Sequence, residues 1–226
     1  LRDDIKRLPL FGLGCVGGAA GIARIHDYLR AWPTHSAILL SVELCSLTLQ
    51  RSDPSMANLV ASALFGDGAA AVVMRGSRVD GAGPSVVATR SALYPGTERV
   101  MGWDIGDTGF RIVLGADVPE VVHRHLDTDM KAFLGDHGLT VADVAAWVCH
   151  PGGPKVLQAV ESTLRLPPGA LDVTWASLAR IGNLSSASVL HVLHDTMASR
   201  RPPVGSPGVL LAMGPGFCSE LVLLEW

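Results

Sequence analysis

The sequence predicts an α/β protein built in layers. Short apolar runs, about four to eight residues long as buried strands are, alternate along the chain with stretches of helical periodicity. The strands are continuously apolar, which is typical of sheets covered by helices on both faces. Hydrophobic residues make up 48% and charged residues 17% of the 226 residues, so the chain has the side chains for a sizeable core and is not a disordered protein.

The first predicted elements surround Cys15. In the stretch LPLFGLGCVGGAAG, residues 8–13 favour a buried strand, and residues 19–31 have helical periodicity. The pattern places Cys15 at a strand-to-helix turn, where free backbone N–H groups and the positive end of the helix dipole favour a thiolate. A cysteine in an apolar run is more commonly a small core residue, and this stretch alone leaves both interpretations open.

The remaining elements follow in alternation. Strands are predicted at residues 37–44, 69–74, 85–89, 110–114, 145–149, 209–213 and 219–226. Helices are predicted at residues 57–64, 118–134, 155–164 and 184–198, with Thr140 capping a further short helix, and residues 45–54 and 94–109 are expected to be loops. Residues 75–84, rich in Gly, Ser and charge, predict a boundary between two parts, residues 1–76 and 77–226.

Three polar residues follow predicted strands or loops and precede helices: Cys15, His150 and Asn183. In layered α/β proteins such positions meet in a crevice. These residue types suit a thiol nucleophile, an imidazole that forms an ion pair with the thiolate, and His and Asn N–H groups that hold an oxyanion or enolate. Taken singly, His150 is more commonly a core or capping histidine, and Asn183 a helix cap or turn residue.

Charge and cysteine content exclude several classes of protein. The net charge is −3 without a cluster of Lys and Arg, which argues against a nucleic-acid partner. The four cysteines are widely spaced without a CxxC pair, which argues against a zinc ribbon, a redox motif or a disulfide scaffold and favours free thiols in the cytoplasm. No apolar run reaches the ~18 residues of a membrane span. The N-terminus lacks a signal peptide and an initiator Met, so we expect a chain without its beginning.

Five motifs occur in a characteristic order along the chain. They are GCVGGAAG around Cys15, LFGDGAAAVV from Leu64, CHPGGPKVL around His150, GNLSSASVL around Asn183, and GPG at residues 214–216. This set resembles the motifs of type III polyketide synthases, the chalcone synthase-like family, and covers essentially the whole chain. The resemblance implies a thiolase-like fold, a layered αβαβα sandwich of two related halves, in a homodimer. Family chains are longer at the front, which implies an incomplete N-terminal half here.

The resemblance also implies a role for each of the three polar residues. Cys15 matches the nucleophile that takes the acyl starter from an acyl-CoA and holds the growing chain as a thioester. His150 and Asn183 match the pair that decarboxylates malonyl-CoA and stabilises the enolate, which then attacks the thioester in a Claisen condensation. The acyl-CoA and malonyl-CoA are substrates; no metal and no bound cofactor is implied.

Further residues match the family's substrate pocket. Phe65 matches a gatekeeper phenylalanine, Ile112 stands where the family usually has a second one, and Cys45 resembles a cavity cysteine of some bacterial members. A core aromatic and an inert buried thiol are the alternatives for Phe65 and Cys45; for Trp103, expected to help set the cavity's length, the alternative is an aromatic that packs between lobes. The family's GFGPG loop corresponds to residues 212–216, which keep only the GPG. The predicted pocket residues are Phe65, Cys45, Trp103, Ile112, Ser185, Gly214, Pro215 and Gly216.

The stretches LFGLGCVGGAAGIAR and MGWDIGDTGF further resemble bacterial synthases that take long acyl starters and make alkylresorcinols or alkylpyrones. One alternative is a β-ketoacyl carrier-protein synthase, which shares the Cys, His and Asn; the HPGGPK context of His150 and the terminal GPG favour the polyketide synthase. Another alternative is a non-catalytic homologue or an inactive fragment that serves as a dimer partner. A cysteine protease is not supported by any motif.

Overall fold

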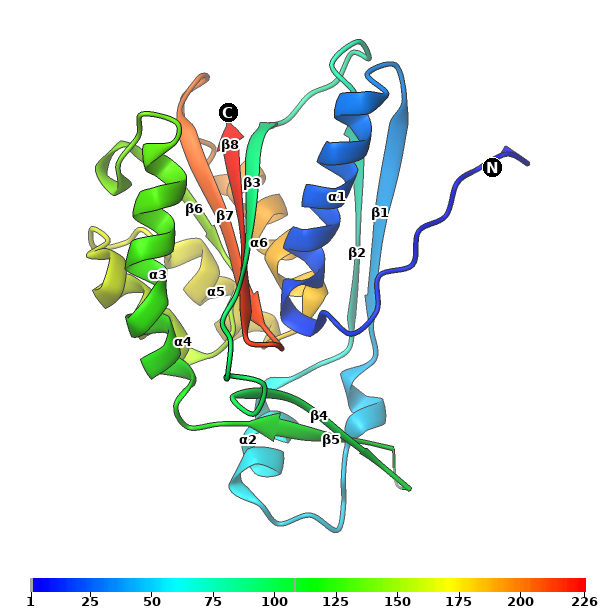
Figure 1. The fold of residues 1–226 in the computed structure, drawn as a ribbon, viewed down its shortest axis with the longest axis vertical. Helices are drawn as coiled ribbons and strands as arrows, with labels where there is room; N and C mark the ends of the chain where they lie inside the picture. The colour runs from blue at the N-terminus through cyan, green and yellow to red at the C-terminus, as the bar shows by residue number, and fades with distance from the viewer. Residues whose placement is uncertain (1, 108) are drawn as a thin grey trace.

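The computed structural model describes residues 2–107 and 109–226 (Figure 1). The helices are α1 (Gly17–Ala31), α2 (Met56–Leu64), α3 (Val118–Gly135), α4 (Pro154–Leu164), α5 (Asp172–Ile181) and α6 (Ser186–Ser199). The strands are β1 (Ser36–Glu43), β2 (Gly68–Arg75), β3 (Ser85–Leu93), β4 (Met101–Gly106), β5 (Gly109–Leu114), β6 (Ala146–Cys149), β7 (Pro207–Gly214) and β8 (Cys218–Glu225). Short 3-10 turns lie at η1 (Gly14–Val16), η2 (Cys45–Thr48) and η3 (Val141–Asp143).

The elements stack in alternating layers of sheet and helix, as the sequence predicts. The antiparallel pair β1–β2 forms the first layer, and helices α1 and α6 lie between it and a mixed four-stranded sheet of order β3-β8-β7-β6 (Figure 1). Helices α3 and α4 cover the other face of that sheet. The hairpin β4–β5 is a separate two-stranded sheet next to α2. The predicted layered α/β class is therefore confirmed.

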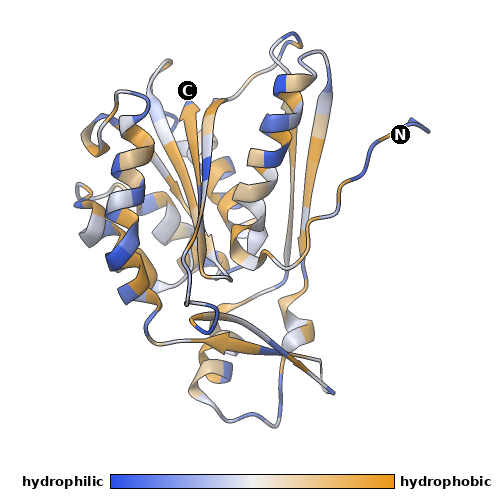
Figure 2. Ribbon diagram, in the orientation of Figure 1, coloured by the Kyte–Doolittle hydropathy of each residue, from blue (hydrophilic) through white to orange (hydrophobic). Residues whose placement is uncertain are grey.

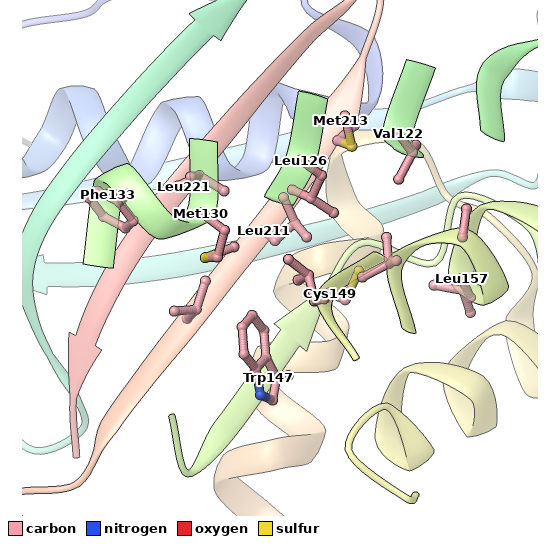
Figure 3. Close-up of a cluster of buried hydrophobic side chains, with 14 of the residues drawn as sticks. Val122, Leu126, Met130, Phe133, Trp147, Cys149, Leu157, Leu211, Met213 and Leu221 are labelled. Atoms are coloured by element: carbon pink, nitrogen blue, oxygen red, sulfur yellow. The ribbon is translucent and has the colours of Figure 1, made fainter. Parts of the chain in front are cut away.

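The four-stranded sheet is buried on both faces, and its central strands β7 and β8 are apolar at most positions. In β7, Val209 and Leu211 pack with α3 and α4, whereas Leu210 and Ala212 pack with α1 and α6. Figure 2 shows these central strands as mostly hydrophobic. Figure 3 shows the cluster on the α3 side, where side chains of α3, α4, β6, β7 and β8 meet. Alternation of side chains along a strand thus gives one sheet two cores.

Helix α1 crosses α6 unusually closely because small residues lie at the crossing. A Cβ atom on Gly18 would lie 2.2 Å from the backbone oxygen of Ser186, and one on Gly17 would lie 3.0 Å from the Ser186 Cβ. Only a residue without a Cβ allows this approach without moving a backbone. The crossing brings the start of α1 next to the start of α6, and the candidate site lies there.

The first sheet differs from the prediction of fully buried strands. In β1 the burial alternates, and Leu40 and Val42 remain 72% and 67% exposed. Strand β2 alternates in the same way. The physical reason is that α1 and α6 cover one face of the pair, whereas no helix among residues 2–107 and 109–226 covers the other.

Three further expectations are wrong. The segment at residues 8–13 forms no strand; it runs as an extended chain with Leu8 and Phe11 exposed, because it pairs with no neighbouring strand. The expected loop at residues 94–109, which includes residue 108 outside the described residues, contains β4. Helix α5 was not predicted. Consequently His150 is the one member of the predicted trio that follows a strand.

Other expectations agree closely with the structure. Helices α3, α4 and α6 begin and end within two residues of their predicted bounds. Thr140 caps η3 in a capping box with Asp143. The predicted division into residues 1–76 and 77–226 stays a prediction. No helix in the described part of the chain is long and apolar enough to cross a membrane.

Candidate active site

Cys15 lies in η1, at the entrance to α1, and is 4% exposed. The preceding Gly14 has a φ of +49°, which a glycine adopts readily, and it packs against Pro215 of the turn between β7 and β8. Gly214 also lies against this loop, because a Cβ there would come within 3.3 Å of the Cys15 Cβ. The GPG turn between β7 and β8 therefore packs against the cysteine loop and holds it in place.

His150 comes directly after β6, and its backbone N–H donates to the Leu211 oxygen of β7 over 2.8 Å, so that the parallel pairing extends to the histidine. The imidazole is buried, and neither of its nitrogens has a hydrogen-bond partner among the described residues. Burial lowers the pKa of His150 to about 3. The ring is therefore neutral at physiological pH and free to exchange a proton with a bound group.

Asn183 lies between α5 and α6 and is fully buried. Its backbone forms an isolated parallel bridge with Phe65: the Asn183 N–H donates to the Leu64 oxygen over 2.8 Å, and the Gly66 N–H donates to the Asn183 oxygen over 2.9 Å. The FGDG motif after α2 thus fixes the position of the asparagine through main-chain bonds. This contact explains why two motifs far apart in sequence belong to one site.

The structure brings the three predicted residues together. The Asn183 Nδ2 lies 4.0 Å from the Cys15 Sγ and 3.4 Å from the Gly152 oxygen. Cys15 and His150 line the same small cavity, together with Gly152, Cys149 and Met213. The thiol therefore shares a cavity with the imidazole and lies next to the Asn183 amide N–H group, an arrangement that suits an acyl nucleophile beside an oxyanion site.

The ionisation of Cys15 differs from the expectation. Burial raises the pKa of this thiol to about 12, although hydrogen bonding by Asn183 and Ser185 opposes the shift. The carboxylate of Glu43 adds to the rise. Desolvation therefore opposes the effect of the helix start on Cys15, and the thiolate–imidazolium ion pair stays a prediction.

A large groove leads away from the cysteine. Cys15 lines it together with seven of the eight predicted pocket residues: Phe65, Cys45, Trp103, Ile112, Ser185, Pro215 and Gly216. Gly214 is the exception, since it packs on the cysteine loop instead. The side chains of Trp103 and Phe110 meet edge to face at 5.8 Å on the β4–β5 hairpin, so an aromatic pair lies beside the groove. The pocket roles of these residues stay predictions.

Glu43 is a residue of the groove that the sequence analysis did not predict. Its side chain lies at the end of β1, lines the groove, and accepts hydrogen bonds from the Ser186 hydroxyl and N–H at the start of α6. The Ser41 hydroxyl continues this series of hydrogen bonds, because it forms a 2.7 Å hydrogen bond with the Ser186 hydroxyl. The sequence signal that could have identified Glu43 is its position as the one charged residue in an otherwise apolar predicted strand.

No group of three or more His, Cys, Asp or Glu side chains in the described part of the chain could hold a metal ion. The four cysteines are free thiols, and Cys149 next to His150 is as buried as Cys15, with its pKa raised to about 12 by burial. Position relative to His150 and Asn183 therefore distinguishes Cys15, rather than its burial.

Comparison with known proteins gives consistent matches along the chain. The family model for the C-terminal domain of chalcone and stilbene synthases matches residues 85–225, and the model for their N-terminal domain matches residues 1–78. The chain is 63% identical to a 1,3,6,8-tetrahydroxynaphthalene synthase of Streptomyces peucetius subsp. caesius, covering 100% of this chain and 60% of that protein. It is 30% identical to Pks18 of Mycobacterium tuberculosis, named for alpha-pyrone synthesis, covering 100% of this chain and 58% of that protein.

Among solved structures, the chain resembles the crystal structure of 1,3,6,8-tetrahydroxynaphthalene synthase from Streptomyces coelicolor A3(2), a bacterial type III polyketide synthase. The TM-score is 0.95 at 34% identity, over 100% of this chain and 64% of that one. The polyketide synthase domain of Steely1 from Dictyostelium matches with a TM-score of 0.90 at 26% identity, over 99% of this chain and 63% of that one. The thiolase-like architecture is thereby confirmed. The chain spans about three fifths of the length of the relatives described here.

Proposed function

The chain belongs to the chalcone and stilbene synthase family, the type III polyketide synthases, and from this membership we propose that the whole protein builds a polyketide on Cys15 from CoA thioesters. The single observation that supports the mechanism most is the convergence of three side chains. The Asn183 Nδ2 lies 4.0 Å from the Cys15 Sγ, and His150 lines a small cavity together with Cys15.

The first proposed step is acyl transfer to Cys15. Because burial keeps the thiol protonated and the imidazole neutral, His150 takes the thiol proton as sulfur attacks the thioester carbonyl. The bond from the carbonyl carbon to the CoA sulfur breaks, and the leaving thiolate receives the proton from His150. The unpartnered ring nitrogens of His150 support this role, since no competing hydrogen bond to a described residue has to be broken.

The second proposed step is decarboxylation of malonyl-CoA. The thioester oxygen of malonyl-CoA accepts hydrogen bonds from the His150 ring N–H and the Asn183 Nδ2. The bond to the carboxylate breaks, CO2 leaves, and the negative charge moves to that oxygen as an enolate. The enolate carbon then attacks the Cys15 thioester, and the Cys15 sulfur leaves as a thiolate, so the chain, now two carbons longer, is a CoA thioester. For the next round this chain is transferred back to the Cys15 sulfur, and the CoA thiol is released as in the first step. Repetition and cyclisation complete the product.

For the product, we favour a tetrahydroxynaphthalene. The relative at 63% identity carries that name, and its identity extends over the whole of this chain. The ten ring carbons of naphthalene correspond to five two-carbon units, and the molecule has no alkyl tail, so malonyl-CoA alone can supply it.

The second candidate is an alkylresorcinol or alkylpyrone made from a long acyl-CoA starter. It is supported by the aromatic and aliphatic side chains of Trp103, Phe110 and Ile112 along the groove that begins at Cys15. Such an apolar lining favours contact with an acyl tail over contact with water. The relative named for alpha-pyrone synthesis, at lower identity, is the corresponding comparison.

A single experiment separates the two candidates. The whole protein is incubated with malonyl-CoA alone and with malonyl-CoA plus a twelve-carbon acyl-CoA, and the products are analysed by mass spectrometry. The first candidate predicts tetrahydroxynaphthalene from malonyl-CoA alone and no gain from the acyl-CoA. Products that form only with the acyl-CoA and retain its tail would support the second.

Two controls test the family reaction itself. Cys15→Ala should give no product with either set of substrates. Replacing malonyl-CoA by malonyl carrier protein should also give no product. Product formation that depends strictly on the carrier protein would identify a β-ketoacyl carrier-protein synthase instead. A whole protein that releases no CO2 from malonyl-CoA under any of these conditions would support the non-catalytic alternative. The homodimer and the cytoplasmic location belong to the same proposal.

A further inference from the structure

The side-chain oxygen of Asn183 is held by two donors. The backbone N–H of Ser185 donates to Oδ1 over 2.8 Å, and the hydroxyl of Ser188 donates to it over 3.5 Å. A backbone N–H can only donate, so the atom that it meets has to be the amide oxygen. This contact fixes which end of the amide faces Cys15, namely the Nδ2 group.

Ser188 is placed to act on this amide. It is fully buried on the first turn of α6, and the Leu184 N–H donates to its oxygen over 2.6 Å. A hydroxyl has one hydrogen and two lone pairs. Because the Leu184 N–H occupies a lone pair, the Ser188 hydrogen is free to point at the Asn183 Oδ1.

We propose that Ser188 is a positioning residue that orients the Asn183 amide toward the acyl chain on Cys15. The inference rests on the proposed polyketide synthase function and extends it by one residue. With two donors on Oδ1, rotation of the amide about its terminal torsion, which is otherwise broad, is restricted. The two Nδ2 hydrogens are then directed at the Gly152 oxygen and at the space beside the Cys15 sulfur.

A second buried hydroxyl of α6 provides a matched comparison. Thr196 is 3% exposed, and its hydroxyl donates to the Val192 oxygen over 2.8 Å within the helix. This is an ordinary bond to the carbonyl four residues earlier, and it does not involve the site. Ser188 differs because its hydroxyl links the Leu184 backbone to a side chain that faces the cysteine. Thr196→Val therefore removes a buried hydroxyl of the same helix without touching Asn183.

The test uses the whole protein and CO2 release from malonyl-CoA labelled at its free carboxylate. For Ser188→Ala we expect kcat to fall roughly tenfold, as for one lost buried hydrogen bond, with KM within about twofold. The iodoacetamide reaction of Cys15 should stay within about twofold, because the cysteine loop is not changed. Thr196→Val should keep the parental kcat. Ser188→Cys, which keeps the size and a weak donor, should fall between the parent and Ser188→Ala.

A double-mutant cycle distinguishes positioning from a purely structural role. If Ser188 acts through the Asn183 amide, Ser188→Ala should cause no further loss of decarboxylation once Asn183→Ala is present. A further loss in that background, or a Ser188→Ala enzyme with parental kcat, overturns the inference. If Ser188→Ala does not fold, the same comparison with Ser188→Cys decides. A parent that releases no CO2 would instead refute the proposed function, so the two failures are distinguishable.

Discussion

The two main sheets of this molecule are made from equally apolar sequences but are buried to different extents. In the four-stranded sheet, β7 and β8 are buried at nearly every position, because α1 and α6 cover one face and α3 and α4 cover the other. In the β1–β2 pair only the face toward α1 and α6 is covered, and Ile38, Leu40 and Val42 of β1 lie open. The hydrophobicity of a segment therefore predicts that it forms a strand, but it does not predict how many faces of its sheet are covered.

The comparison also explains where the site forms. Helices α1 and α6 are shared by both sheets, and their starts meet at the crossing of Gly18 and Ser186. Cys15 precedes one of these helices and Asn183 precedes the other, while His150 follows the edge strand β6 of the better covered sheet. The three side chains thus lie where the two packed helices begin, and the open face of β1 borders the groove that leads from Cys15, since Ile38, Leu40 and Val42 are among its lining residues.

The sharpest test of the difference between the sheets is a matched pair of Leu→Ala substitutions in this chain. Leu211 of β7 is 1% exposed and packs among α3 and α4, so Leu211→Ala should lower the free energy of unfolding by about 2–5 kcal/mol. Leu40→Ala on the open face should change it by about 0.5 kcal/mol or less. Urea denaturation measures both. Equal losses would mean that the outer face of β1 is covered in solution.

The pH dependence of stability tests the burial of His150. Because burial lowers the pKa of this imidazole from its ordinary 6.5 to about 3, the unfolded chain binds the proton more readily than the folded one. Stability should be fully present above pH 6.5 and fall as the pH drops from about 6.5 toward 3, by at most on the order of 1.4 kcal/mol per pH unit. His150→Phe should flatten this part of the urea-denaturation profile. A His150→Phe variant that keeps the full slope of the parent between pH 6.5 and 3 would show that the pH dependence does not come from the burial of His150.

A substitution at the close crossing of α1 and α6 should cause the next largest loss of stability. Gly18→Ala should lower the free energy of unfolding by about 1–3 kcal/mol, since the new Cβ would lie 2.2 Å from a backbone oxygen and one helix has to move. The same movement separates Cys15 from Asn183, so product formation by the whole protein should fall as well. Gly135→Ala is the control, because a Cβ there meets no atom within 4 Å, and it should be neutral or slightly stabilising.

The smallest effect concerns the exposed N-terminal segment. The Lys6 ammonium lies 5.1 Å from the Trp32 ring centroid and 5.5 Å from that of Tyr28, at the end of α1. Exposed cation–π contacts contribute about 0.5–1 kcal/mol, so Lys6→Ala should leave global stability nearly unchanged. It should instead speed proteolysis within residues 2–13. Unchanged proteolysis would show that these rings do not anchor the segment.

Local sequence patterns predicted what depends on near neighbours along the chain. The bounds of α3, α4 and α6, the Thr140 cap and the delivery of His150 by β6 all follow from periodicity and capping residues. The meeting of Cys15, His150 and Asn183 was predicted from their motifs and is present in the structure.

Properties that depend on distant contacts were not predictable in the same way. Residues 8–13 are as apolar as a buried strand, but a strand also needs a partner, and the described structure offers them none. The ionisation of Cys15 depends on its total burial, which the helix start does not reveal. The contact of Ser188 with Asn183 needs the turn at Ser185, whose φ of +50° no propensity favours for serine.

The most direct test of the central claim is to find the residue that carries the acyl group. The whole protein is mixed with malonyl-CoA or an acyl-CoA, quenched with acid, and analysed by intact-mass and peptide mass spectrometry. We predict a thioester adduct on the peptide that contains Cys15, absent in Cys15→Ala and retained in Cys45→Ala and Cys149→Ala. An adduct that persists in Cys15→Ala, or that maps to Cys45 or Cys149, would contradict the assignment of Cys15 as the nucleophile.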